Sequence, residues 1–388
     1  MKASSGKKAV KTNIFVRILA LLVTAVLVVG ALLLVVYRDR LSMDALKRWL
    51  TYRSLETSDS GEAAPFTHAG GDKLALAYLS SGVLQASTTG SHYYTFSGDL
   101  LTEKVQAMEN PVLSATHQAG LVYDAGGQSL CLFRDGSLAF HQTLEGNADL
   151  LSARINREGY FAVTAQQSGY KGAVTVYDPQ GERLIQIRLS STFVVDAVLS
   201  PDSRTVAVIT MDQQGGSFSS QVLLYPVNRT EPKAVFDLGN TVVLDVDYEY
   251  DRLWVLGEDR LIILSEDGET AAHYDFGRSF LKGCDFGGDG FALLLLSHYR
   301  TGSADQVLIV GPDGTVIAST DPAGQLLAFD AAGNYCSVLT GSALHIYNRE
   351  LVPYSTLSTT QGARYTALAP DGSALLANNQ RAWLYIPG

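Results

Sequence analysis

The chain has 388 residues and a formal net charge of −10 at pH 7. The charge is unevenly distributed: residues 1–53 carry ten Lys or Arg against two Asp or Glu, a formal charge of +8, which leaves −18 on residues 54–388. A body this acidic excludes nucleic acid as a partner, because nucleic-acid binding needs a basic surface. The three cysteines are scattered and form no C-x-x-C pair, which indicates buried small side chains rather than a disulfide framework or a metal site.

The N-terminal part predicts a membrane anchor. A basic tail, residues 1–17, precedes twenty consecutive residues without a charge, which begin at Ile18 and end at Tyr37. A helix of that length spans about 30 Å, the thickness of the hydrocarbon core. A cleaved signal peptide is expected to have a shorter apolar region that ends in small residues. We therefore predict an uncleaved transmembrane helix over residues 18–37 that holds the protein in the cell membrane.

The next residues predict a second helix and a tether. Residues 38–55 have helical apolar spacing, and two interpretations are open: an interfacial helix along the lipid headgroups, or a plain helical spacer. Residues 56–64 form a polar linker. Basic residues flank the span almost equally, so the positive-inside rule alone does not decide the orientation. The short tail and the acidic, Cys-poor body favour a cytoplasmic N-terminus and an extracytoplasmic body.

Residues 65–388 contain an internal repeat built from strands and turns. In the clearest copy, apolar strands flank a Ser-Pro-Asp-Ser turn at residues 200–203. A strand-only repeat of about 40 residues is typical of a β-propeller with one four-stranded blade per repeat. Eight copies of the turn follow one another at intervals of 38 to 48 residues, and their last residues are Gly82, Gly120, Gly159, Ser203, Asp251, Gly290, Gly333 and Gly372.

Each repeat has turns enough for four strands. A second turn, such as Asp135-Gly136, follows the first by about fifteen residues, and Asp-Gly between apolar runs is a strong hairpin signal. Some strands are apolar without alternation, as at residues 291–296, which indicates that neighbouring blades cover both faces. We predict an all-β fold with eight blades; seven would result if the first and last repeats shared one blade.

The last repeat lacks its outermost strand. An open propeller would leave an unpaired strand edge there. We therefore expect residues 64–70 to pair beside residues 383–386 and close the ring.

The turns at residues 200–203 (Ser-Pro-Asp-Ser) and 369–372 (Ala-Pro-Asp-Gly) resemble those of WD-repeat-like and quinoprotein-like propellers. The layout of basic tail, single span, short helix and acidic propeller is similar to a family of membrane-anchored propeller proteins from clostridial Gram-positive bacteria, whose function is not established. The resemblance implies the propeller over residues 65–388 and the anchor. The sequence lacks the regular tryptophan motif of the quinoproteins, so no cofactor is predicted.

Three carboxylates on the predicted inner strands, Asp196, Asp245 and Asp285, are expected to border the ring axis. They would either meet a cation such as Ca²⁺ or a polar ligand there, or tie neighbouring blades by hydrogen bonds. We favour the second interpretation because buried polar groups nearly always have partners. No histidine or cysteine has metal-pair spacing and no catalytic motif occurs, so no metal site and no catalytic residue are predicted.

Three repeats have a long connection between their second and third strands, at residues 165–172, 211–220 and 297–305. Equivalent connections emerge on one face of a propeller, and lengthened loops there often form binding sites. Neutral insertion into exposed loops is the alternative. The candidate binding residues on these connections are aromatic or cationic: Tyr170, Lys171, Phe218, His298, Tyr299 and Arg300.

Two functions are consistent with these patterns. The first is a noncatalytic, membrane-tethered binding or scaffold module outside the cytoplasm, with a protein or a cell-surface glycan polymer as its partner. The alternative is a cell-envelope hydrolase or lyase whose site lies at the axis. Residues from distant blades can assemble such a site without a local motif. The lack of a compact catalytic constellation in the sequence favours the binding module.

Overall fold

The structure is a computed structural model that describes residues 19, 21–24, 43–146, 148–214, 216–265 and 270–388. The chain divides into two compact units, Met1–Ser54 and Leu55–Gly388. The predicted tail and nearly all of the predicted transmembrane helix lie outside the described residues. Within the described part of the chain, no helix is both long enough and apolar enough to cross a membrane.

In the first unit, helix α2 (Met43–Tyr52) lies within the stretch where a second helix is predicted. Its side chains Met43, Leu46, Trp49 and Leu50 are each more than half exposed. Positions three and four apart share one face of a helix, so these residues form an exposed apolar stripe. Such a stripe beside basic residues is typical of an interfacial helix.

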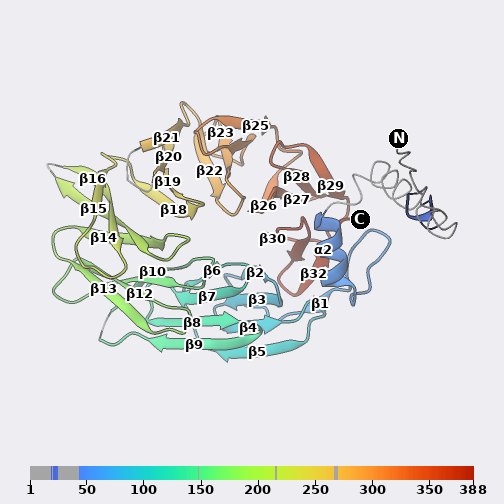
Figure 1. Ribbon diagram of the computed structural model, residues 1–388, viewed down its shortest axis with the longest axis horizontal. Coiled ribbons are helices and arrows are strands. Elements are labelled where there is room, and N and C mark those ends of the chain that lie inside the picture. The colour runs from blue at the N-terminus through green and yellow to red at the C-terminus, as the bar shows by residue number, and fades with distance from the viewer. Residues whose placement is uncertain (1–18, 20, 25–42, 147, 215, 266–269) are drawn as a thin grey trace, which may run out of the picture. The chain divides into compact units, whose positions relative to one another are not determined.

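The second unit is a ring of eight antiparallel four-stranded sheets, which confirms eight blades rather than seven (Figure 1). In blades 1 to 7 the innermost strand is the first strand of the blade along the chain. In blade 8 the innermost strand is β30. Blade 1 contains β2 (Ala75–Leu79), β3 (Gly82–Ser87), β4 (Gly90–Tyr94) and β5 (Leu100–Val105), and blade 2 contains β6 (Pro111–Ala115), β7 (Ala119–Asp124), β8 (Ser129–Arg134) and β9 (Ser137–Thr143). Blade 3 contains β10 (Leu150–Ile155), β11 (Phe161–Ala165), β12 (Gly172–Tyr177) and β13 (Arg183–Leu189), and blade 4 contains β14 (Phe193–Leu199), β15 (Thr205–Gln214), β16 (Ser217–Pro226) and β17 (Ala234–Asp237).

Blades 5 to 8 continue in the same order. Blade 5 contains β18 (Val243–Glu249), β19 (Arg252–Gly257), β20 (Arg260–Leu264) and β21 (Thr270–Asp275), and blade 6 contains β22 (Phe280–Asp285), β23 (Ala292–Ser297), β24 (Gln306–Val310) and β25 (Val316–Thr320). Blade 7 contains β26 (Leu326–Ala332), β27 (Tyr335–Thr340), β28 (Leu344–Asn348) and β29 (Pro353–Leu357), and blade 8 contains β30 (Tyr365–Leu368), β31 (Ala374–Ala377), β32 (Arg381–Tyr385) and β1 (Phe66–Thr67).

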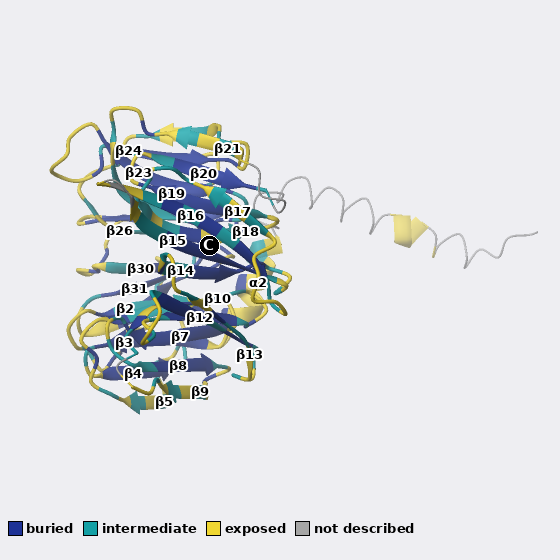
Figure 2. Cartoon of the chain, turned by 90° about the vertical axis from the view of Figure 1, so that its left-hand side faces the viewer, coloured by how far each residue is buried: buried dark blue, intermediate teal, exposed yellow. Residues whose placement is uncertain are grey.

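The core lies between the blades. Every residue of the middle strand β23 is buried, whereas the outer strand β9 alternates between exposed and half-buried positions, and Figure 2 shows the same contrast between middle and outer strands. One apolar cluster joins blades 5 and 6, where the rings of Trp254 and Phe286 lie 6.2 Å apart. The continuously apolar strands are therefore the ones covered on both faces, as predicted from their lack of alternation.

Asp251 ends its turn as predicted, whereas Gly120 does not. In the turn between β18 and β19 the positive φ, +53°, belongs to Tyr250 and not to Asp251, because a two-residue hairpin requires it at its first central residue. Gly120 lies inside β7 without a positive φ. A Cβ atom there would lie 2.2 Å from Leu84 of the neighbouring blade, so this glycine is needed for close packing instead.

The ring closes as predicted, by pairing the two ends of the second unit. Phe66 pairs with Ala382 and Thr67 with Arg381, which places β1 at the free edge of β32. The Ala63 N–H donates to the Leu384 carbonyl at 2.8 Å, so the pairing continues before β1. The closure removes the unpaired edge that β32 would otherwise expose.

Loss of this closing strand is expected to destabilise the whole ring. A chain that begins at residue 69 lacks β1, whereas a chain that begins at residue 55 keeps it and serves as the matched control. We expect thermal unfolding of the shorter chain at a clearly lower temperature, with aggregation through the exposed edge of β32. Equal melting temperatures for the two chains would contradict a closing role for β1.

Candidate binding face and axial acidic cluster

Five successive inner strands begin with the same irregularity. In β10, β14, β18, β22 and β26, one residue near the start of the strand has no partner on the next strand. This unpaired residue follows the first paired residue in β10, β18 and β26, and the second paired residue in β14 and β22. A β-bulge of this kind re-aims the side chain of the extra residue. Blades 1, 2 and 8 show no such shift in the corresponding pairing.

The bulged starts expose large apolar side chains. Leu151, Leu244 and Leu327 occupy the bulge in blades 3, 5 and 7, and they are 37%, 53% and 41% exposed. In blades 4 and 6, Phe193 and Phe280 are exposed at the first residue of the inner strand. We call these five residues the axial rim. Strands of a blade run antiparallel, so the rim lies on the face where the second and third strands connect, which we call the binding face.

The first long connection reaches the neighbouring blade. Lys171, just before β12, lies 3.5 Å from the Asp212 carboxylate on β15 and 4.7 Å from the ring centre of Phe193. The guanidinium of Arg188 lies over the exposed ring of Tyr170 at 5.7 Å. The loop of blade 3 and the hairpin of blade 4 are therefore brought together, as a shared binding face requires.

The second long connection is not a loop, which corrects the interpretation of residues 211–220. Strands β15 and β16 stay paired from Thr205 with Pro226 to Gln214 with Ser217, so the insertion lengthens the hairpin. Residues 211–214 pair with residues 217–220, so the backbone groups of the insertion find partners across the hairpin. Phe218 is 51% exposed on this extension.

The third long connection folds on itself at the binding face. The Asp305 carboxylate lies 3.1 Å from His298 Nδ1 and accepts the backbone N–H of the same residue. The Arg300 carbonyl accepts a hydrogen bond from Lys282 Nζ at 2.9 Å, and Tyr299 is 72% exposed. The connection between β23 and β24 stands out from one face of the ring in Figure 2. Within the described residues, no hydrogen bond, ion pair or ring contact joins it to Tyr170 or Phe218.

Near the axis, one arginine joins two of the predicted carboxylates. Arg154 of β10 donates to Asp196 of β14 at 2.9 Å and to Asp245 of β18 at 2.5 Å. Ser152 also donates to Asp196. Burial opposes the charge of Arg154, but the surrounding carboxylates raise its pKa above the ordinary value. This guanidinium ties three blades together, which is the structural role favoured from the sequence.

Further acidic groups lie on the same inner strands. Asp285 of β22 and Asp330 of β26 share a hydrogen bond between their carboxyl groups, and burial raises the pKa of Asp285 to about 6 and that of Asp330 well above its usual range. Asp247 is accessible to solvent but enclosed by the inner strands, and this desolvation raises its pKa to about 6. We call Arg154, Asp196, Asp245, Asp247, Asp285 and Asp330 the axial cluster.

At the opposite end of β18, a second arginine links distant blades. Glu249 is buried and lies 3.1 Å from Arg157, whose guanidinium is also 3.4 Å from Asp289. Glu249 accepts a hydrogen bond from the Gly290 N–H at 3.3 Å. Burial raises the pKa of Glu249 to about 7, against the opposing effects of Arg157 and this hydrogen bond. The carboxyl group is thus held where ionisation is costly.

The arrangement bears on the calcium hypothesis. The described residues contain no group of three or more His, Cys, Asp or Glu side chains with the geometry to hold a metal ion. Between Asp196 and Asp245, the cation shared by the two carboxylates is the Arg154 guanidinium. Arg154, Arg157 and Asp330 were not predicted as site residues from the sequence. The structure shows one regularity: Arg154, Asp247, Asp285 and Asp330 each lie three residues after the bulge of their strand.

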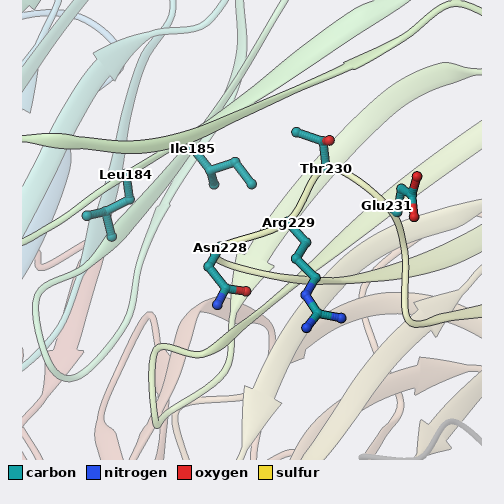
Figure 3. A pocket seen from close by; sticks show the side chains of 6 residues that line it. All are labelled: Leu184, Ile185, Asn228, Arg229, Thr230 and Glu231. Atoms are coloured by element: carbon teal, nitrogen blue, oxygen red, sulfur yellow. The ribbon is translucent and has the colours of Figure 1, made fainter.

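A separate hollow of about 390 Å³ lies beside the outer strand β13 (Figure 3). Because β13 is an outer strand, this hollow belongs to the circumference of the ring and not to the axis. Its lining comes from β13 and from the connection between β16 and β17: Leu184, Ile185, Asn228, Arg229, Thr230 and Glu231.

The model of a protein family described as a family of unknown function (DUF5711) matches residues 51–352. The chain belongs to the DUF5711 family. No curated protein matches this member of the family significantly. Its fold is similar to the C-terminal WD40 domain of Sif2, with a TM-score of 0.56 and 11% identity over 85% of this chain and 97% of that one.

Two further structures show the same likeness. The computationally designed protein Ika8 matches with a TM-score of 0.59 and 13% identity, over 83% of this chain and 99% of the design. BamB from Moraxella catarrhalis matches with a TM-score of 0.51 and 13% identity, over 84% of this chain and 99% of BamB. At these identities the likeness establishes the propeller fold of this DUF5711 member, in agreement with the WD-repeat-like turns.

The raised pKa of Glu249 predicts a specific dependence of stability on pH. The pKa is about 7 in the folded protein and 4.5 as the ordinary value, so the unfolded chain releases this proton first as the pH rises. The free energy of unfolding should therefore fall by about 3 kcal/mol between pH 4.5 and 7 because of this group and then level off.

Glu249→Gln tests this dependence, because glutamine keeps the shape and does not titrate. Urea unfolding at a series of pH values should show a smaller decline for Glu249→Gln than for the parent. Glu231→Gln, on an exposed connection, is the matched control and should leave the decline unchanged. Parallel pH profiles for all three proteins would contradict the assignment of the raised pKa to Glu249.

Proposed function

We propose that this protein is a noncatalytic binding or scaffold module, tethered to the cell membrane with its propeller outside the cytoplasm. The carrying observation is the distribution of exposed aromatic side chains. Six aromatic residues of the propeller are exposed among those described, and five of them lie on the binding face. The five are Tyr170, Phe193, Phe218, Phe280 and Tyr299; the sixth, Tyr250, lies at the opposite face.

This distribution supports binding because exposed apolar side chains gathered on one face are typical of interaction sites. Aromatic residues and arginine are enriched at protein–protein interfaces, and a rim of Leu and Phe suits apolar side chains of a protein better than a sugar polymer. The internal contact between Lys171 and Asp212 holds part of the face in place before binding, which lowers the entropy cost of association. A protein partner is therefore preferred over a glycan.

The tether is supported by two features of the N-terminal unit. Residues 18–37 carry no charge over the length of a membrane span. The exposed stripe of α2, with Trp49 at its centre, matches a helix that lies at the headgroups. The short basic tail favours a cytoplasmic N-terminus.

A hydrolase or lyase is the second candidate, and the Asp285–Asp330 pair favours it. Two carboxyl groups that share a hydrogen bond and have raised pKa values are able to donate a proton at neutral pH. The backbone N–H groups of Gly287 and Leu368 also donate to this pair, which supports a structural role. Hydrolysis of purified cell-wall polymer that is lost in Asp330→Asn would favour the enzyme over the binding module.

A photo-crosslinking amino acid placed at the binding face tests partner binding. Tyr170, Phe218 and Tyr299 are replaced one at a time by benzoylphenylalanine, and intact cells are irradiated. We expect one discrete crosslinked product from these positions. Val235 and Val316, which are exposed on the outer strands β17 and β25, are the matched controls. Equal crosslinking from face and control positions, or none from the face, would argue against the proposal.

Alkaline phosphatase fused after Gly388 tests the orientation, since this enzyme becomes active only outside the cytoplasm. We expect an active fusion in intact cells, and an inactive fusion when residues 18–37 are deleted. An inactive full-length fusion at normal abundance would reverse the proposed orientation without affecting the binding face.

A further inference from the structure

The axial rim and the axial cluster are two levels of the same strands. In β18, Leu244 is exposed at the binding face, Asp245 follows it directly, and Asp247 lies ~7 Å deeper than Asp245 along the strand. In β26, Asp330 lies three residues after the exposed Leu327, the same spacing as Asp247 from Leu244. A ligand that covers the apolar rim therefore has carboxylates beneath its centre.

The charges at the axis are not balanced within the protein. The inner strands of blades 4 to 7 contribute five aspartates, and Arg154 is the only arginine or lysine that contacts them in the described residues. Its contacts go to Asp196 and Asp245. The Asp247 carboxylate accepts a hydrogen bond from the backbone N–H of Tyr248 at 2.7 Å. Among the described residues, no side-chain cation lies in hydrogen-bonding contact with this solvent-accessible carboxylate.

Two lysines of the binding face are engaged within the protein. Lys171 pairs with Asp212, and Lys282, in the bulge of β22, donates to the Arg300 carbonyl of the third long connection. The face thus has a largely apolar rim around a negative centre. Charge complementarity across such a face selects a partner with a positive centre inside an apolar surround.

We propose, building on the proposed binding function, that the binding face receives a protein segment in which a Lys or Arg side chain is flanked by apolar residues. The apolar residues cover the axial rim, and the cationic side chain enters the axis toward Asp247 and Asp245. The long aliphatic stem of lysine or arginine fits this path, because it packs along apolar surface while its head reaches the carboxylates. A compact metal ion would contact only the carboxylates of the axial cluster and would leave the apolar side chains of the axial rim exposed.

The experiment uses the full-length protein in nanodiscs and a phage-displayed library of short random peptides. Peptides enriched over empty nanodiscs are synthesised, and their affinities are measured by fluorescence anisotropy. We expect enriched peptides with one Lys or Arg among apolar residues. Replacing that residue by Gln should weaken binding about tenfold, and the affinity of the parent peptide should fall with rising salt.

Variants of the protein locate the two levels separately. Asp247→Asn should reproduce the tenfold loss, and it should melt close to the parent because asparagine keeps the shape of the exposed Asp247 side chain. Asp321→Asn, an exposed acid on the connection between β25 and β26 at the same face, is the matched control and should bind like the parent. The double variant Leu244→Ser, Leu327→Ser should weaken the Lys and Gln peptides alike.

The outcomes separate this inference from the broader proposal. Enriched peptides without a basic residue, or unchanged affinity for Asp247→Asn at a native melting temperature, overturn the inference while binding at the rim still stands. No enrichment over empty nanodiscs also overturns it. Crosslinking from Tyr170, Phe218 and Tyr299 in cells then decides independently whether the face binds any protein.

Discussion

Closure of the ring is the constraint on which the rest of the structure depends. Each blade buries its apolar faces only against two neighbours, so the core has no free end as long as blade 8 is complete. That blade takes three strands from the end of the chain and one, β1, from the start of the propeller. Trp383 of β32 is fully buried in this composite blade. The burial of eight sheets therefore rests on a short strand pairing between segments more than 300 residues apart in sequence.

Much of this fold is legible in the sequence because its signals are local. Asp135-Gly136 forms the predicted turn with both φ angles positive, and Ser203 has a φ of +59° at the end of the Ser-Pro-Asp-Ser turn. The turn predicted at Gly120 is wrong because this glycine is required for close contact between two blades, and a tertiary contact of that kind is not visible in the local sequence. Residues 211–220 are predicted as a loop because their Ser and Gln residues do not show the apolar pattern of a strand. Only pairing across the hairpin makes them extended.

The candidate site was predictable in part, for the same reason. Asp196, Asp245 and Asp285 were assigned to inner strands, where the structure places them. Arg154 was missed because its partners lie one and two blades further on, at separations of 42 and 91 residues. The axial rim was missed because Leu244 at the start of a strand looks like a core residue. A bulge that turns it outward leaves no trace in the residue types.

The bulges divide the ring into two unequal arcs, one of five blades and one of three. Blades 3 to 7 carry them, and each of these blades is built from one uninterrupted stretch of chain; blades 8, 1 and 2 lack them and include the seam. The seam between β1 and β32 lies outside the bulged arc, directly after the N-terminal unit in the chain. Tension on the chain before β1 would therefore act on this seam first, before it reached the bulged blades.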